Sequence, residues 1–113
     1  MSIEGDIQAL LAALVSGRAY PLVAPDPVAK PYTVFQVIVE TPQNNLDGAS
    51  GLSNRRFQID HYATSYGAVK TLAESTKTAM AGASFKSLHL SSIDFYENDT
   101  QLYRIMMDFS VWT

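Results

Sequence analysis

Two histidines, His61 and His89, have the widest catalytic repertoire of the side chains in this sequence. Asp60 precedes His61 in an alternating segment, and neighbouring side chains of a strand point to opposite faces, so these two cannot form an Asp–His pair within one strand. His89 could reach His61 only from an adjacent strand. Because no HExxH or HxH spacing accompanies either histidine, we expect no metal site, and the alternative is that His61 is half-buried in a core and His89 packs between leucines.

A nucleophilic serine is the second possibility, since Ser50 is flanked by glycines in Gly48-Ala49-Ser50-Gly51. This is not the G-x-S-x-G of a strand-to-helix elbow, because the segment falls between two expected strands. The chain has no cysteine, which excludes disulfides, thiolate catalysis and cysteine zinc sites. Neither a Walker loop nor G-x-G-x-x-G is present. We therefore expect no enzymatic activity, no catalytic residue and no cofactor.

The charge and hydropathy of the chain limit the kinds of partner that it can bind. The net charge is -3, and the eight Lys and Arg residues are scattered, with Arg55-Arg56 as the one adjacent pair. Duplex DNA recognition needs clustered cations, so we expect no sequence-specific nucleic-acid contact. Glu4 and Asp6 precede an N-terminal apolar run that is too short for a bilayer, which predicts neither a signal peptide nor a membrane span. Charged residues are only 17% of the chain, a hint that a partner covers part of the surface.

The first half of the chain predicts one helix and one hairpin. Apolar residues at helical spacing indicate a helix over residues 2–16, closed by Gly17. Four prolines between residues 21 and 31 then favour an extended connector with one short edge segment at 18–23. Residues 33–40 and 54–62 are rich in β-branched or alternating residues and are expected strands. Residues 41–53 are rich in Pro, Asn, Asp, Gly and Ser, and we expect a long loop of the functional kind.

The second half repeats this order. A helix is expected over residues 65–81, with a buried stripe that includes Tyr66, Val69 and Met80. Strands at 87–97 and 102–112 flank a turn at 98–100. One domain of residues 1–113 therefore has the order α-β-β-α-β-β, and the expected class is α+β, an antiparallel sheet of two hairpins with two helices packed on one face.

Three segments are candidate contact surfaces. Tyr96 and Trp112 fall on less clearly buried phases of the last hairpin, and such aromatics often anchor interfaces. Arg55 and Arg56 could grip a partner's carboxylates or cover an edge against aggregation, and the sequence does not decide between these two roles. The long loop is the third. The candidate interface residues are Asn44, Asn45, Leu46, Asp47, Leu52, Arg55, Arg56, Tyr96 and Trp112.

An ordered set of short motifs spans nearly the whole chain. The set comprises Gly17-Arg18-Ala19-Tyr20-Pro21, Pro25, Lys30-Pro31-Tyr32-Thr33-Val34-Phe35-Gln36, Leu46-Asp47-Gly48, Arg56-Phe57-Gln58-Ile59-Asp60, Tyr66 with Ala68-Val69-Lys70 and Leu72-Ala73, Tyr96-Glu97, Leu102-Tyr103-Arg104 and Asp108-Phe109-Ser110-Val111-Trp112. With this set the chain resembles the tail-completion (tail-terminator, tail-to-head joining) proteins of phages and prophages. It departs at His61, where a small or apolar residue would be usual.

The resemblance implies a structural protein that caps the tail tube and joins tail to head, as a subunit of a hexameric ring. The implied partners are further copies of the chain, the major tail tube protein and the head-completion or connector proteins. The implied location is the bacterial host cytoplasm during assembly and then the virion tail. Two other readings are a small-molecule or protein binding module with no virion role, and a hydrolase that uses His61 or His89.

Overall fold

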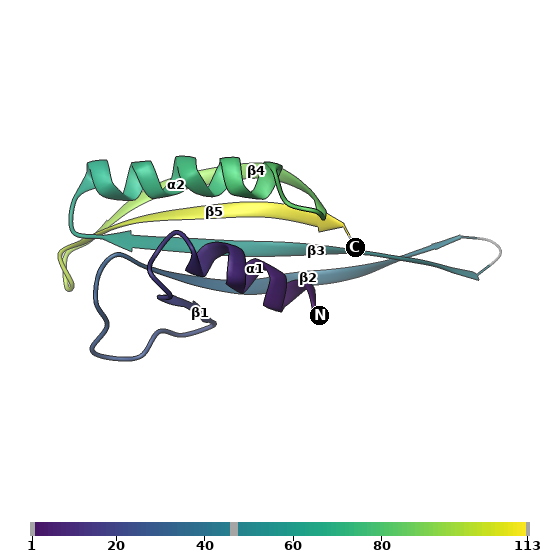
Figure 1. The fold of residues 1–113 in the computed structure, drawn as a ribbon, viewed down its shortest axis with the longest axis horizontal. Helices are drawn as coiled ribbons and strands as arrows, with labels where there is room; N and C mark the ends of the chain where they lie inside the picture. The colour runs from purple at the N-terminus through teal and green to yellow at the C-terminus, as the bar shows by residue number, and fades with distance from the viewer. Residues whose placement is uncertain (1, 46–47, 113) are drawn as a thin grey trace.

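The computed structural model describes residues 2–45 and 48–112, and between residues 42 and 52 it describes the backbone alone. Two helices, α1 (Ile3–Ala12) and α2 (Tyr66–Ala81), accompany five strands. The strands are β1 (Ala19–Pro21), β2 (Tyr32–Asn45), β3 (Gly48–Ala63), β4 (Lys86–Glu97) and β5 (Leu102–Trp112). They form one sheet in the order β1-β2-β3-β5-β4 (Figure 1).

The α+β class and the two helices agree with the sequence, but the sheet is mixed rather than purely antiparallel. The expected short edge segment is β1, and it pairs with β2 in parallel, with Ala19 opposite Thr33. The connector makes this possible because it returns the chain to the start of β2, where the Arg18 guanidinium donates to the Pro31 carbonyl at 2.8 Å. The order is therefore α-β-β-β-α-β-β, a correction that adds one parallel strand at the edge.

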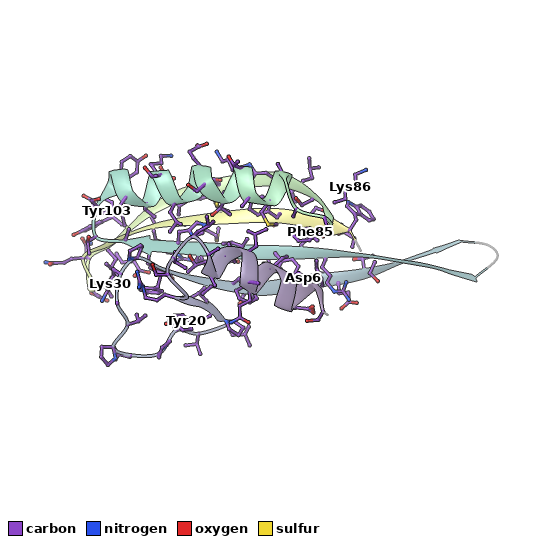
Figure 2. All side chains as sticks on the ribbon, in the orientation of Figure 1. Asp6, Tyr20, Lys30, Phe85, Lys86 and Tyr103 are labelled. Carbon is purple, nitrogen blue, oxygen red and sulfur yellow. The ribbon has the colours of Figure 1, made fainter. Side chains whose placement is uncertain are left out.

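Both helices cover one face of this sheet. Helix α1 buries Ile3, Ile7 and Leu11, and α2 buries a stripe that starts at Val69 and ends at Met80. These side chains share one apolar core with alternate residues of the strands: Phe35, Phe57, Ile59, Ile105, Met107, Phe109 and Val111. Tyr66 is an exception to the predicted stripe, since it is 46% exposed and its hydroxyl donates to Asp94 instead. Figure 2 shows all described side chains on the ribbon.

The helix ends reflect local chemistry. Ser2 and Ser65 each accept a backbone N–H in the first turn of their helix, from Gly5 and Ala68, both at 3.1 Å. Helix α1 ends at Ala12, four residues before the predicted end. The chain turns here through left-handed backbone at Ser16 (φ 53°) and Gly17 (φ 86°), a conformation that glycine adopts at little cost. The Gly17 N–H reaches the Ala12 carbonyl at 2.8 Å and closes the turn.

The predicted loop at residues 41–53 is wrong, because most of it belongs to two long strands. Strands β2 and β3 stay paired from Tyr32 opposite Tyr62 to Asn45 opposite Gly48. Strand β5 ends opposite Asn54, so the hairpin beyond that row has no third strand on the β3 side. We call this projecting segment, residues 42–45 and 48–53, the arm. It extends well past the helices, and the molecule measures 52 × 25 × 24 Å (Figure 1).

Candidate functional site

His61 is fully buried where the core face of β3 meets α2. Its Nδ1 atom lies 2.8 Å from the Thr33 hydroxyl, and its Nε2 atom lies 2.9 Å from the Thr76 hydroxyl. Because the single hydroxyl proton of Thr76 is donated to the Leu72 carbonyl at 2.9 Å, Thr76 accepts from Nε2–H. Nδ1 is then unprotonated and accepts from Thr33. The imidazole thus ties β2, β3 and α2 together.

Burial also fixes the charge of this histidine. Desolvation lowers the pKa of His61 from 6.5 to about 3, so the ring is neutral at neutral pH. His61 lies on the core face as the sequence predicted, but deeper than half-buried. His89 sits on β4 opposite Phe109, whereas His61 pairs with Ile105, and β5 separates the two histidines. His89 is half-exposed, and its Nε2 atom lies 2.8 Å from the Ser92 hydroxyl on the same strand.

Asp60 points to the other face of the sheet, which the helices leave open. Its carboxylate accepts from Arg104 at 3.1 Å and from Gln58 at 2.9 Å. The guanidinium of Arg104 also lies over the rings of Tyr62 and Phe95, at 5.9 and 5.0 Å from their centroids. The predicted separation of Asp60 from His61 is therefore confirmed. Within the described residues no group of three His, Asp or Glu side chains could hold a metal ion.

The Arg55-Arg56 pair is divided between the two faces. Arg56 pairs with Asp108 on the open face, and Arg55 pairs with Glu40 at 3.0 Å at the base of the arm. Each guanidinium therefore already contacts a carboxylate of its own chain. Both contacts are partly exposed, and surface ion pairs of this kind contribute at most about 1 kcal/mol to stability, so they orient side chains more than they hold the fold.

The other predicted contact residues fall in two places. Asn44, Asn45 and Leu52 lie in the paired strands of the arm, while Leu46 and Asp47 lie outside the described residues. Tyr96 is exposed on β4, and Trp112 is half-buried at the end of β5. Tyr96 is therefore separate from the arm, because it sits near the opposite end of β4, whereas Trp112 pairs with Asn54 at the base of the arm.

Strand β4 carries a feature that the sequence reasoning missed. Leu88, Leu90, Ile93 and Phe95 are exposed, with 60% exposure at Leu88. Leu88, Ile93 and Phe95 pair with Ser110, Met106 and Arg104, which belong to the open face. The alternation of these apolar residues with Ser87, His89 and Asp94 was the available signal, but alternation alone does not say which face the helices cover.

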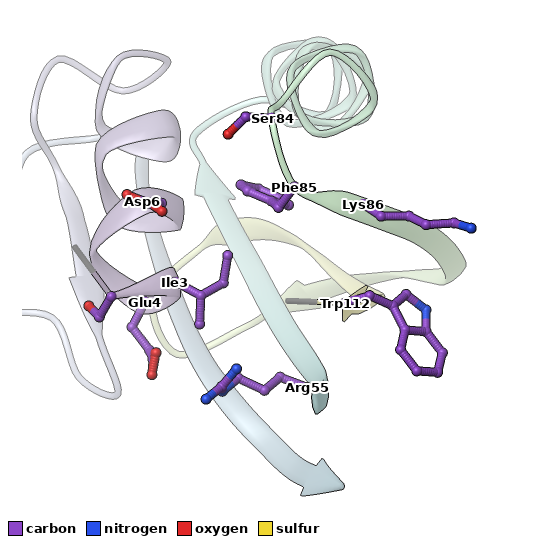
Figure 3. A pocket seen from close by; sticks show the side chains of 9 residues that line it. Ile3, Glu4, Asp6, Arg55, Ser84, Phe85, Lys86 and Trp112 are labelled. Carbon is purple, nitrogen blue, oxygen red and sulfur yellow. The ribbon is translucent and has the colours of Figure 1, made fainter. Parts of the chain in front are cut away.

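Two grooves lie beside α1. One, of about 560 Å³, opens where the arm leaves the body and includes Ile3, Phe85 and Trp112 in its lining (Figure 3). The other, of about 470 Å³, lies between α1 and β2 beyond the end of β1, and Phe35 and Val37 form its apolar side. Glu4 lines both grooves, and its Oε2 atom is buried with no hydrogen-bond partner among the described residues. Figure 3 shows Glu4 and Arg55 pointing toward one another.

His61 is held in the core, and the carboxylates of Glu40, Asp60 and Asp108 are in ion pairs, while a sheet face, a strand edge and an arm are open. This arrangement is typical of a small α+β protein that acts through its surfaces. Residues 7–113 match the family model of tail completion protein gp17. The chain belongs to this family, and that places it among the structural proteins of phage tails.

A solved structure has the same fold. A chain in the virion of the native gene transfer agent (GTA) particle superposes with a TM-score of 0.67 at 21% identity, over 92% of this chain and 84% of that chain. No curated protein sequence matches the chain. Neither helix of the described residues has the length and apolar character needed to cross a bilayer.

Proposed function

We propose that this chain is the ring subunit that caps the phage tail tube and joins tail to head, and that it has no enzymatic activity. The family match over residues 7–113 carries the proposal. The fold shared with a chain of the gene transfer agent virion supports it, since that chain too is part of a virion. The ring would be a hexamer, and the subunit would act in the bacterial host cytoplasm before it enters the virion.

The shape of the subunit supports a ring. Identical subunits close into rings through heterologous contacts, in which one surface binds a different surface on the next copy. The arm projects from one end of the sheet and is available to a neighbour, and the exposed apolar side chains of β4 lie on the outer edge of the same sheet. The further partners are the major tail tube protein on one side of the ring and the head-completion proteins on the other.

The test is electron microscopy of particles from a host in which this gene is deleted. Overlong tails, or heads and tails that remain unjoined, are the expected products, and a plasmid copy of the gene restores normal particles. Normal infectious particles from the deletion strain would refute the proposal. The groove between α1 and β2 would then favour a small-molecule binding module, which a thermal-shift screen of ligands tests.

A further inference from the structure

The sheet has two open edges. At one side, β4 is the last strand, and no described strand pairs with its outer edge. At the other side, β1 covers β2 only at residues 33–35. Two more backbone bonds flank this pairing, from the Leu22 N–H to the Phe35 carbonyl and from the Thr33 N–H to the Arg18 carbonyl. Residues 37–41 of β2 therefore pair only with β3 within the described residues. Unpaired backbone on an edge strand is a template for another chain.

Both edges carry exposed apolar residues. Leu88, Leu90, Ile93 and Phe95 lie on β4, and Ile38 and Val39 lie on the open segment of β2. Soluble proteins usually protect a long edge strand with charge, proline or a covering element. Strand β4 is twelve residues long and contains no proline. A partner strand at the Lys86 end of β4 would cover this part of the edge and the side chains of Leu88 and Leu90.

The strand directions identify the partner. Strand β2 runs antiparallel to β3, β3 to β5, and β5 to β4, so β2 and β4 run in opposite directions. If copies are related by rotation about an axis along the strands, β4 of one copy meets β2 of the next as an antiparallel pair. We propose that residues 86–90 of β4 bind residues 37–41 of β2 in a second copy of this chain, so that the sheet continues from subunit to subunit. The rest of β4, beyond the register shift between His89 and Ser91, bends away from the neighbour's β1, which covers residues 33–35. This inference rests on the proposed ring.

The register of this contact follows from the sheet. Val39 pairs with Arg56, Arg56 with Ser110, and Ser110 with Leu88, so Val39 and Leu88 occupy one row. Rotation about an axis along the strands keeps rows level, which sets Leu88 opposite Val39 of the neighbour. Thr41 and Lys86 share the row of Trp112 in the same way. Leu88 and Val39 also point to the same face, the open one.

On the helix-covered face of this contact, a hydrogen-bond donor of β4 would face acceptors near β2 of the neighbour. His89 falls on the row of Val37, on the helix-covered face, beside the groove of about 470 Å³ that Val37 and Glu4 line. Glu4 offers a buried carboxylate oxygen without a hydrogen-bond partner among the described residues. His89 at this end of β4 is a donor, and Glu4 and Glu40 near the open segment of β2 are acceptors. Figure 2 shows Asp6 and Lys86 at the end of the body from which the arm projects.

Cysteine cross-linking tests the register, because the chain contains no cysteine of its own. Particles are complemented with the double variant Val39→Cys/Leu88→Cys, oxidised with a copper catalyst and run on a non-reducing gel. Directly opposed strand residues have Cα atoms about 4.5–5.5 Å apart, within disulfide reach. Within one subunit these positions are three strand spacings apart, roughly 14 Å, so only an intersubunit bond can form. We expect a ladder of covalent oligomers from the double variant and monomers from each single variant.

The matched control is Val23→Cys/Leu88→Cys, since Val23 is 75% exposed but lies in the connector, and we expect no ladder from it. Thr41→Cys/Lys86→Cys is a second test of the same register, should the first pair fail to assemble. Normal particles without a ladder from the assembled pairs, or a ladder from the control pair, would overturn the inference and leave the ring intact. Normal particles from the gene deletion would instead refute the ring itself.

Discussion

Nδ1 of His61 lies 2.8 Å from Oγ1 of Thr33, inside a core where the imidazole has no access to water. The bond requires an unprotonated Nδ1, because Thr33 is its donor when Thr76 accepts from Nε2. A histidine at this position can therefore do what an apolar residue cannot, and join three elements by hydrogen bonds. The same arrangement makes the fold sensitive to acid.

Stability should fall below pH 6.5. Burial lowers the pKa of His61 to about 3 in the folded state, whereas the unfolded chain binds the proton near 6.5. Between these values the unfolded state holds more protons, so the free energy of unfolding is unaffected above pH 6.5 and decreases as the pH falls toward 3, by about 1.4 kcal/mol per unit. Urea unfolding at pH 6.5 and pH 5 should differ by about 2 kcal/mol from this group.

The variant His61→Gln isolates that contribution, because glutamine keeps hydrogen-bonding capacity and does not titrate in this range. It should lose about 2 kcal/mol of the difference between the two pH values. If the unfolding free energy of the parent and of His61→Gln changed equally with pH, the imidazole of His61 would not be held neutral by burial.

Loss of the Thr76 hydroxyl should lower the free energy of unfolding far more than loss of the neighbouring Thr78 hydroxyl on the same helix. Thr76→Val removes the acceptor of Nε2–H and leaves a buried donor unpaired, which costs about 1–3 kcal/mol. Thr78 makes a similar bond to the helix backbone, from its hydroxyl to the Glu74 carbonyl at 3.2 Å, but it is exposed. Thr78→Val should therefore change the free energy of unfolding by less than about 0.5 kcal/mol. Similar losses in both variants would contradict the buried role of Thr76.

Two phenylalanines of the sheet, one buried and one exposed, should contribute unequally to the free energy of unfolding. Phe57 is fully buried against both neighbouring strands, and Phe57→Ala should cost about 3–5 kcal/mol of unfolding free energy. Phe95 is 41% exposed on β4, and the guanidinium of Arg104 lies 5.0 Å from the centre of its ring. Phe95→Ala should cost about 1 kcal/mol or less, in line with an exposed cation–π contact. Chemical denaturation measures both, and a loss at Phe95 as large as that at Phe57 would place β4 inside the core.

The elements with one wet face and one apolar face were predictable from the sequence. Helix α2 begins after Ser65 and ends before Gly82, close to the predicted 65–81, and the strand predicted at 102–112 is β5, in which Ile105, Met107, Phe109 and Val111 are buried. Strand β1 was harder, because three residues bounded by proline carry too little pattern to fix a parallel partner. The mixed sheet therefore required the three-dimensional path of the connector.

The missed parts of the candidate site have a common cause. The arm has no sheet or helix packed beyond the row of Thr41 and Asn54, so its residues need no apolar alternation, and their Asn, Gly and Ser content resembles that of a loop. Strand β4 does alternate, but Leu88, Ile93 and Phe95 point to the open face. A pattern reveals which residues share a face, and only packing reveals which face the helices bury.

Shortening the arm should separate stability from assembly. Replacement of residues 43–52 by Asn-Gly joins Pro42 to Ser53, which are paired in the ladder, through a two-residue hairpin turn. Beyond Thr41 and Asn54 the two strands have only each other, and an isolated two-stranded hairpin is marginally stable, so unfolding should change by about 1 kcal/mol or less.

The same variant should fail to complement the gene deletion, because the arm holds the predicted contact residues. A full-length control, Asn44→Ala/Asn45→Ala, tests whether those amides or only the reach of the arm is needed: a fall in titre implicates the amides, and a normal titre implicates reach. Denaturation of the purified variants and the titre of infectious particles are the two measurements. A shortened arm that supports a normal titre would remove the arm from the interface and leave the β4 edge as the remaining contact surface, whereas a shortened arm that unfolds the protein would show that it contributes to the core.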